Sequence, residues 1–151
     1  MTQREKQIIG RVERVLFPVM DLEAYARIDT GAKTSSIHVT LTEETARGLK
    51  VRFFDDQTER FFKHYEKTVI ASSMGHKEVR YKVKLSVVIR RRRVLTSFTL
   101  ANRSTQVYPV LIGRNTLMKK FIVDVAKGTP LKDEENRRSE ILKTLIIEEN
   151  K

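Results

Sequence analysis

The chain has 151 residues, enough for one domain to bury a hydrophobic core, and it contains no cysteine. Neither a disulfide framework nor a thiolate metal site can therefore form. Its 30 Lys and Arg exceed its 19 Asp and Glu, which gives a formal net charge of +11. Residues 129–151 hold five basic and six acidic side chains, so residues 1–128 carry +12. Such a charge favours acidic partners, among them RNA, anionic lipid and acidic polypeptides.

The first residues lead into a strand-like segment. We see neither an apolar stretch as long as a transmembrane helix nor the pattern of a secretory signal. We therefore expect a cytoplasmic protein without a membrane partner.

Short segments of mixed apolar and polar residues follow one another along most of the chain, a pattern typical of β-strands. Strands are predicted at residues 8–17, 22–28, 36–40, 51–54, 60–63, 69–73, 78–89, 94–100, 107–112 and 121–125. Two pairs of these strands flank polar turns and predict hairpins, 51–54 with 60–63 and 69–73 with 78–89. One short helix is expected over residues 114–119, after Gly113. This density of strands predicts an all-β domain, a closed or nearly closed barrel.

The segment that follows Gly128 differs in kind. Between residues 140 and 149 apolar side chains recur at helical spacing, at Ile141, Leu142, Leu145 and Ile146. We therefore expect a barrel domain over residues 1–128 and an amphipathic C-terminal helical extension over residues 129–151.

The most informative stretch is Asp-Thr-Gly-Ala at residues 29–32. In aspartic proteases the reacting carboxylate lies on a tight loop at a strand end, where glycine permits the turn and a Thr hydroxyl fixes it. Two such carboxylates side by side cannot both be ionised, so one accepts a proton from water while the other protonates the peptide carbonyl. Asp29, Thr30 and Gly31 are therefore the candidate catalytic residues. The competing interpretation is an ordinary turn, which the triplet also suits.

The order of motifs resembles that of retropepsins. A strand leads into Asp-Thr-Gly-Ala, a β-rich middle follows with a hairpin around residues 72–76 as the flap, and Leu-Ile-Gly-Arg-Asn comes at residues 111–115. Because the sequence holds one Asp-Thr-Gly, a symmetric carboxylate pair implies a homodimer with one Asp29 per subunit. Retroviral enzymes usually carry an acidic residue where Lys33 stands, and it pairs with the arginine that corresponds to Arg114. The retroviral style of dimer is therefore not implied.

A longer resemblance is to the RimB-like family, whose members are often labelled ATP-dependent zinc proteases and are considered retropepsin-like. It covers residues 8–126 and rests on motifs at residues 29–38, 73–81, 102–103, 111–114 and 121–124. A lysine at position 33 is expected in that family, which accounts for the departure from the retroviral pattern.

Members of that family are often linked to RimK-like ligases that add glutamates to a ribosomal protein. The resemblance therefore implies an aspartic peptidase that shortens or removes α-linked polyglutamate tails. The positive charge of residues 1–128 is independent of the resemblance and suits a polyanionic peptide. Arginine binds a carboxylate bidentately and lysine as a point charge. The candidate substrate-binding residues are Lys33, Arg80, Arg103 and Arg114, with Ser73 and Gly75 on the flap.

The histidines bear on the zinc of the family label. His38, His64 and His76 are the only ones, and no His-Glu-x-x-His helix exists. A catalytic zinc uses three protein ligands and an open position, and His38 and His76 are the candidates that lie in family motifs. Separated histidines more often form local hydrogen bonds, so we expect no cofactor, with a zinc-dependent peptidase as the alternative. No phosphate-binding Gly-x-x-x-x-Gly-Lys-Ser/Thr loop supports ATP dependence.

The sequence also permits a monomeric enzyme and a protein without catalytic activity. In a monomeric enzyme, Glu78 or Asp124 could complete the carboxylate pair with Asp29. A non-catalytic module could instead bind RNA or an acidic protein on its basic face, and Asp29 would then be dispensable. The Asp-Thr-Gly-Ala and flap motifs favour the peptidase.

Overall fold

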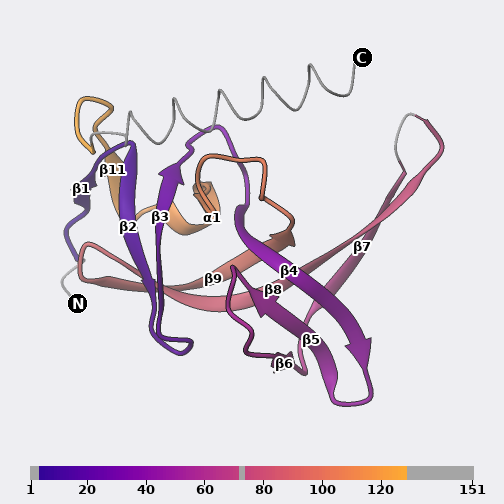
Figure 1. Cartoon of the computed structure of the whole chain (residues 1–151). Coiled ribbons are helices and arrows are strands. Elements are labelled where there is room, and N and C mark those ends of the chain that lie inside the picture. The colour runs from indigo at the N-terminus through magenta and orange to yellow at the C-terminus, as the bar shows by residue number, and fades with distance from the viewer. Residues whose placement is uncertain (1–3, 72–73, 129–151) are drawn as a thin grey trace.

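The computed structural model describes residues 4–71 and 74–128 (Figure 1). The expected C-terminal extension and the tip of the expected flap, residues 72–73, lie outside the described residues. Within them β-strands dominate, and the one helix is the short α1 (Arg114–Leu117) at the expected place after Gly113. No helix in this described part of the chain is long and apolar enough to cross a membrane.

The strands are short except for the two that form the β8–β9 hairpin and for β4. Their bounds are β1 (Gln7–Ile9), β2 (Val12–Phe17), β3 (Leu22–Ile28), β4 (Ser35–Thr45), β5 (Gly48–Phe53), β6 (Arg60–Phe62), β7 (Glu66–Ala71), β8 (Lys77–Ile89), β9 (Arg92–Ala101), β10 (Val110–Ile112) and β11 (Phe121–Val123).

Six strands of the described chain close into a barrel. β10 is hydrogen-bonded to β3, and the order continues through β2, β8 and β9 to β4. β4 pairs antiparallel with β10 and so completes the ring. β5 and β6 continue the sheet beyond β4, β7 pairs with β8, and β1 and β11 form a separate parallel pair. The prediction of an all-β, closed barrel is confirmed.

Alternation of apolar and polar residues in β8 and β9 builds the core. Successive side chains of a strand point to opposite faces, so every second residue enters the barrel. The buried set consists of Val83, Leu85, Val87 and Ile89 on β8 and Val94, Thr96, Phe98 and Leu100 on β9. Phe98 packs edge-to-face on Phe17 of β2, with ring centroids 5.5 Å apart, and links this hairpin to the neighbouring strand.

The predicted single strand over residues 8–17 is wrong, because the chain breaks into β1 and β2 at residues 10–11. At this break the N–H of Arg11 donates to the carbonyl of Lys127 at 2.9 Å. A Cβ on Gly10 would come within 2.2 Å of the backbone nitrogen of Gly128, so only glycine permits the approach. The end of the described chain is thereby attached to its beginning.

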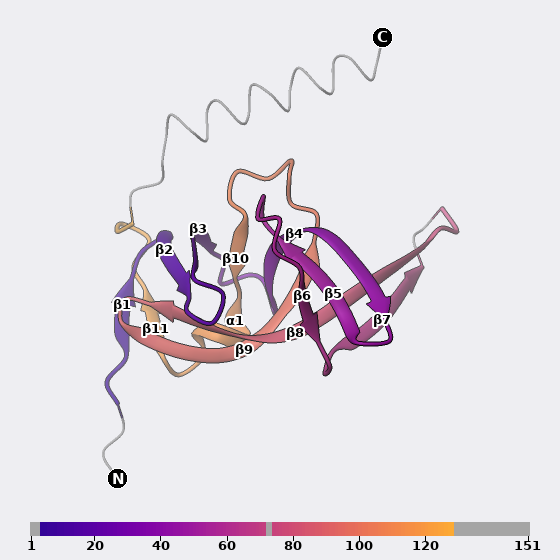
Figure 2. The ribbon, with the colours of Figure 1, turned by 60° about the horizontal axis from the view of Figure 1, so that its bottom comes forward.

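Both predicted hairpins are confirmed. β5 pairs antiparallel with β6, and β7 with β8 from Glu66↔Lys82 to Ala71↔Lys77. The β7–β8 hairpin reaches well beyond the barrel in both views (Figure 1, Figure 2). Near its tip Gly75 has φ of +82°, a left-handed conformation that favours glycine. This arm corresponds to the expected flap.

The complete burial of Phe98 predicts that Phe98→Ala lowers the free energy of unfolding by about 3–5 kcal/mol, because removal of the ring leaves a cavity. Leu95→Ala on the same strand is the control. Leu95 is 67% exposed, so its loss should change stability by less than about 0.5 kcal/mol. Urea denaturation of the two variants and the wild type measures both values, and equal losses would contradict this assignment of the core.

Candidate active site

Asp29 directly follows β3, at the point where the parallel strand β10 also ends. Its N–H donates to the carbonyl of Ile112 at 2.8 Å, which fixes the strand end. The N–H of Gly31 donates to Asp29 Oδ1 at 2.9 Å. A Cβ on Gly31 would lie 3.2 Å from the same oxygen, so a larger residue would crowd the carboxylate. The Asp-Thr-Gly turn thus holds one carboxylate oxygen and leaves the other available for chemistry.

A second segment, residues 113–115, runs against the loop that follows Asp29. Arg114 N–H donates to the carbonyl of Ala32 at 2.8 Å, and Asn115 N–H donates to that of Lys33 at 3.1 Å. A Cβ on Gly113 would come within 2.7 Å of the carbonyl carbon of Thr34 and 2.9 Å of the oxygen of Ala32. The two backbones can approach this closely only with glycine at position 113. The structure therefore explains why the two sequence motifs occur together.

A buried polar network supports this contact from below. Ser35 Oγ lies 2.9 Å from Asn115 Oδ1 and 2.6 Å from Thr116 Oγ1, and it accepts the N–H of Gly113 at 3.0 Å. Asn115 Nδ2 in turn donates to the carbonyl of Ser97 on β9 at 2.8 Å. The network ties β4, α1 and β9 together beneath the Asp29 loop.

Arg114 also contacts the loop through its side chain. Its Nη1 donates to the carbonyls of Thr30 and Gly31 at 3.2 and 3.0 Å. Arg114 and Lys33 are both exposed, but neither is among the residues that line the two clefts beside the loop. Arg114 thus holds the Asp29 loop in place, and substrate binding by Arg114 and Lys33 stays a prediction.

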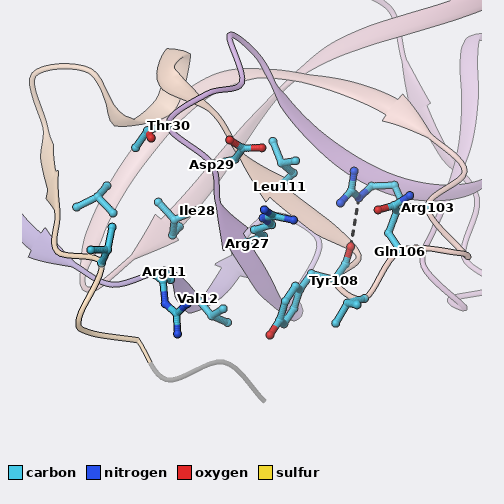
Figure 3. A pocket seen from close by; sticks show the side chains of 13 residues that line it. Arg11, Val12, Arg27, Ile28, Asp29, Thr30, Arg103, Gln106, Tyr108 and Leu111 are labelled. Carbon is cyan, nitrogen blue, oxygen red and sulfur yellow. Dashed lines mark hydrogen bonds between the residues drawn. The ribbon is translucent and has the colours of Figure 1, made fainter. Parts of the chain in front are cut away.

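The first cleft, which we call the arginine cleft, opens beside Asp29 with a volume of about 610 Å³ (Figure 3). Asp29 is the one carboxylate among the described residues that line it. Three cations line it as well, namely Arg11, Arg27 and Arg103. Its remaining walls are mainly apolar and include Val12, Ile28, Tyr108, Leu111, Val123 and Val125.

The second cleft, which we call the flap cleft, has a volume of about 810 Å³ and also borders the loop. Ala32 and Thr34 of the loop line it, together with Glu78 and Arg80 of the flap. Arg103 and Leu111 line both clefts, so the two share a wall. An extended peptide that followed both clefts would pass the Asp29 loop.

Of the four predicted substrate-binding cations, Arg103 is the one that lines both clefts. Its N–H donates to His38 Nδ1 at 2.8 Å and its Nε to the carbonyl of Tyr108 at 3.2 Å (Figure 3). Burial lowers the pKa of its guanidinium, and repulsion by Arg27 lowers it further, while the negative charge of Asp29 acts in the opposite direction. Arg27, Arg103 and Asp29 therefore interact electrostatically across one cleft.

The candidate metal ligands do not come together in the described part of the chain. His38 uses Nδ1 to accept the Arg103 N–H, and His76 lies exposed on the flap arm. No group of three His, Cys, Asp or Glu side chains among residues 4–71 and 74–128 could hold a metal ion. These residues thus do not fit a catalytic zinc, which uses three protein ligands.

Asp124 and Glu78, the same-chain candidates for the partner of Asp29, lie elsewhere. Asp124 Oδ1 accepts the N–H of Ala126 at 2.9 Å within its own turn. Glu78 pairs with Arg80 at 3.5 Å on the flap and lines the flap cleft. Neither side chain lines the arginine cleft.

The predicted flap residues are placed only in part. Gly75 is exposed near the tip of the arm, and Ser73 lies outside the described residues. Substrate binding by both stays a prediction.

Sequence reasoning missed Arg11 and Arg27. The signal for Arg27 was present, because a residue two positions before Asp29 on a strand points to the same face. Arg11 carried no such signal, since it reaches the cleft only through the break between β1 and β2. There its carbonyl accepts the N–H of Ile28 at 2.8 Å.

Ser35→Ala should lower the free energy of unfolding by about 1–3 kcal/mol, because it leaves the buried N–H of Gly113 without its acceptor. The neighbouring Ser36→Ala is the matched control. Ser36 Oγ is only half-buried and makes a longer hydrogen bond, 3.3 Å, to the carbonyl of Thr99. Chemical denaturation compares the two, and a cost for Ser35→Ala no larger than that for Ser36→Ala would refute the importance of the network.

Comparison with known proteins identifies the family. A family model described as "RimB-like: Retropepsin-like aspartic endopeptidase RimB" matches residues 8–133. The chain is also 30% identical over 132 residues to a "Probable alpha-L-glutamate ligase" of Desulfotalea psychrophila, a match that covers 80% of this chain and 28% of the ligase. A protein of the same name from Shewanella pealeana is 30% identical over 134 residues, covering 82% and 29%. The chain thus spans less than a third of the length of these relatives.

A solved structure shares the fold. The crystal structure of protein Lpg0085, of unknown function, from Legionella pneumophila matches with a TM-score of 0.56 at 23% identity. The match covers 82% of this chain and 96% of that one. The barrel, the Asp-Thr-Gly loop packed on Gly113 and the family match agree, and the chain belongs to the RimB-like family of retropepsin-like aspartic endopeptidases.

Proposed function

We propose that this protein is an aspartic peptidase that hydrolyses acidic peptide tails, with α-linked polyglutamate on a modified protein as the substrate class. The observation that supports the proposal is the cleft beside Asp29, which one carboxylate and three arginines line together. A site with this charge attracts a polyanionic peptide and disfavours a cationic one. The name of the related proteins, probable alpha-L-glutamate ligase, adds support, because part of each resembles this chain.

The chemistry requires two carboxylates, and this chain supplies one of them to the arginine cleft. We propose that a homodimer brings two copies of Asp29 together, one from each subunit, with a water between them. Two carboxylates in contact share one proton, because both cannot be ionised at so short a distance. A pair of this kind holds a general base and a general acid at the same pH.

In the proposed reaction the ionised carboxylate takes a proton from the water, whose oxygen forms a bond to the peptide carbonyl carbon. The protonated carboxylate donates its proton to the carbonyl oxygen, which gives a gem-diol. The C–N bond then breaks with its electron pair on nitrogen, and nitrogen receives the proton that the first carboxylate took from water. The second carboxylate takes a proton back from a gem-diol hydroxyl as the carbonyl re-forms. Gly31 N–H and the loop contacts of Arg114 keep Asp29 oriented during these steps.

Asp29→Asn should abolish cleavage, since an amide can neither accept the proton of water nor share a proton with its partner. Mass spectrometry of an oligo-α-glutamate peptide after incubation with the full chain measures the products. Wild type, Asp29→Asn and wild type with a chelator are compared. Shortened peptides are expected from wild type with and without chelator, and none from Asp29→Asn. Normal cleavage by Asp29→Asn would overturn the aspartic mechanism, and loss with the chelator alone would replace it with a zinc-dependent one.

The proposed dimer predicts how cleavage falls when wild type is mixed with the inactive Asp29→Asn variant. Wild type is mixed with increasing amounts of Asp29→Asn, and native mass spectrometry verifies that subunits have exchanged. If each site needs two Asp29 carboxylates, cleavage per total protein should fall with the square of the wild-type fraction, because only wild-type pairs are active. A linear fall would show that one chain holds a complete site, and a carboxylate of the same chain would then be the partner of Asp29.

A further inference from the structure

Arg27 lies on the outer face of β3, between the buried Ala26 and Ile28, and Asp29 follows directly after the strand. Both residues line the arginine cleft. Arg27 is exposed, and its Cα partner on the parallel strand β10 is Leu111, which lines the same cleft. Figure 3 shows its side chain between Asp29 and Tyr108. Arg27 therefore shares the cleft with Asp29.

Arg103 approaches the same place from a different segment, the loop between β9 and β10. Its backbone is anchored on His38 Nδ1 and its Nε on the carbonyl of Tyr108. These contacts fix the guanidinium before any ligand arrives, and preorganisation of this kind lowers the entropic cost of binding. Burial and the nearby Arg27 both lower the pKa of Arg103, as expected for two cations that repel each other.

No carboxylate within the described chain neutralises these arginines by an ion pair. Other cations have such partners, as Arg14 has Glu23 and Arg90 has Glu13. None of the ion pairs between described residues involves Arg11, Arg27 or Arg103. In the proposed dimer the two Asp29 residues would share a proton and carry one negative charge between them. The positive charge beside them would thus remain largely unneutralised until an anion binds.

The walls of the cleft indicate which anion fits. Val12, Ile28 and Leu111 offer apolar surface next to the two guanidinium groups. A glutamate side chain presents methylene groups for such a surface and a planar carboxylate that arginine binds in a forked geometry. A nucleic-acid backbone has a charged phosphate and no apolar stem of this kind. The combination of apolar walls and arginines favours an acidic peptide.

We propose that Arg27 and Arg103 form a specificity subsite that binds the side-chain carboxylate of the substrate residue next to the cleaved bond. This inference rests on the proposed function in that the bond must lie at Asp29. It adds that acidic selectivity comes from a fixed position in the site rather than from the overall positive charge. Arg27 and Arg103 would then be substrate-contacting residues on either side of one carboxylate.

Binding to the full chain carrying Asp29→Asn tests the subsite without turnover. The probes are an oligo-α-glutamate peptide with an amidated C-terminus and a series with one glutamate at a time replaced by glutamine. Arg27→Gln and Arg103→Gln are each expected to weaken binding of the glutamate peptide by about ten- to a hundredfold, the range for a charge-assisted hydrogen-bonded pair. Arg27→Lys should restore part of the loss, since lysine keeps the charge without the fork.

Arg91→Gln is the matched control, because it removes the same charge at an exposed turn that lines neither cleft. It should weaken binding by no more than about twofold, as expected for a distant screened charge. In addition, replacing one particular peptide glutamate with glutamine should weaken binding to the protein with Arg27 but not to the Arg27→Gln protein. That glutamate is the one whose carboxylate Arg27 contacts. Thermal denaturation establishes that each variant is folded. If Arg103→Gln is unstable, the comparison of Arg27→Gln with Arg91→Gln alone decides the test.

Three results would overturn the subsite. Equal losses for Arg27→Gln and Arg91→Gln would attribute selectivity to overall charge. Binding that requires a free peptide C-terminus would assign the arginines to the terminal carboxylate. If an RNA oligonucleotide binds as tightly as the glutamate peptide, and Arg27→Gln lowers its affinity as much, the site binds anions in general.

The proposed function fails separately from the subsite. Arg27-dependent binding without cleavage in any assay would keep Arg27 as a contact for an acidic peptide and refute the peptidase. Cleavage that depends on Asp29 but not on Arg27 would support the peptidase and refute the subsite.

Discussion

The close approach of two backbone segments at Gly113 is the constraint on which the site depends. Residues 32–34 and 113–115 lie so near each other that a single Cβ at position 113 would overlap the chain opposite. Hydrogen bonds from Arg114 and Asn115 to the carbonyls of Ala32 and Lys33 hold the pair together. Because β10 also pairs with both β3 and β4, the Asp29 loop is fixed from three directions. The carboxylate is thereby positioned by the closure of the barrel itself.

The charged side chains around Asp29 distinguish this cleft from the rest of the described surface. Asp29 lies in a cleft with Arg11, Arg27 and Arg103, whereas most ion pairs of the described chain lie on its exposed surface. Exposed pairs contribute little to stability, because water and salt screen them. The arginines of the cleft are different, since one is partly buried and repelled by its neighbour. Binding of the anionic ligand proposed above would relieve this repulsion.

The projecting β7–β8 arm forms one boundary of the flap cleft. Residues 74–80 of this arm are exposed, and Glu78 and Arg80 line the flap cleft. A hairpin with few buried side chains can change its position at small cost, in contrast to the barrel, whose core side chains are fully enclosed. The flap cleft thus has one wall on this exposed hairpin and the others on the barrel and the Asp29 loop.

The all-β class, both hairpins, the short helix after Gly113 and the Asp-Thr-Gly loop could be predicted from the sequence, because each depends on local patterns of apolar residues, turns and glycine. Arg103 could also be predicted as a candidate, because it lies in a family motif. Three features became visible in the folded chain alone: Arg27 and Arg11 share the cleft with Asp29, Arg114 contacts the loop carbonyls, and the strand over residues 8–17 divides at Gly10. These features arise from contacts between segments that are far apart in the chain. Local propensity is enough to place strands, turns and the short helix. The surroundings of a charged side chain depend instead on which distant segments the closed barrel places next to it.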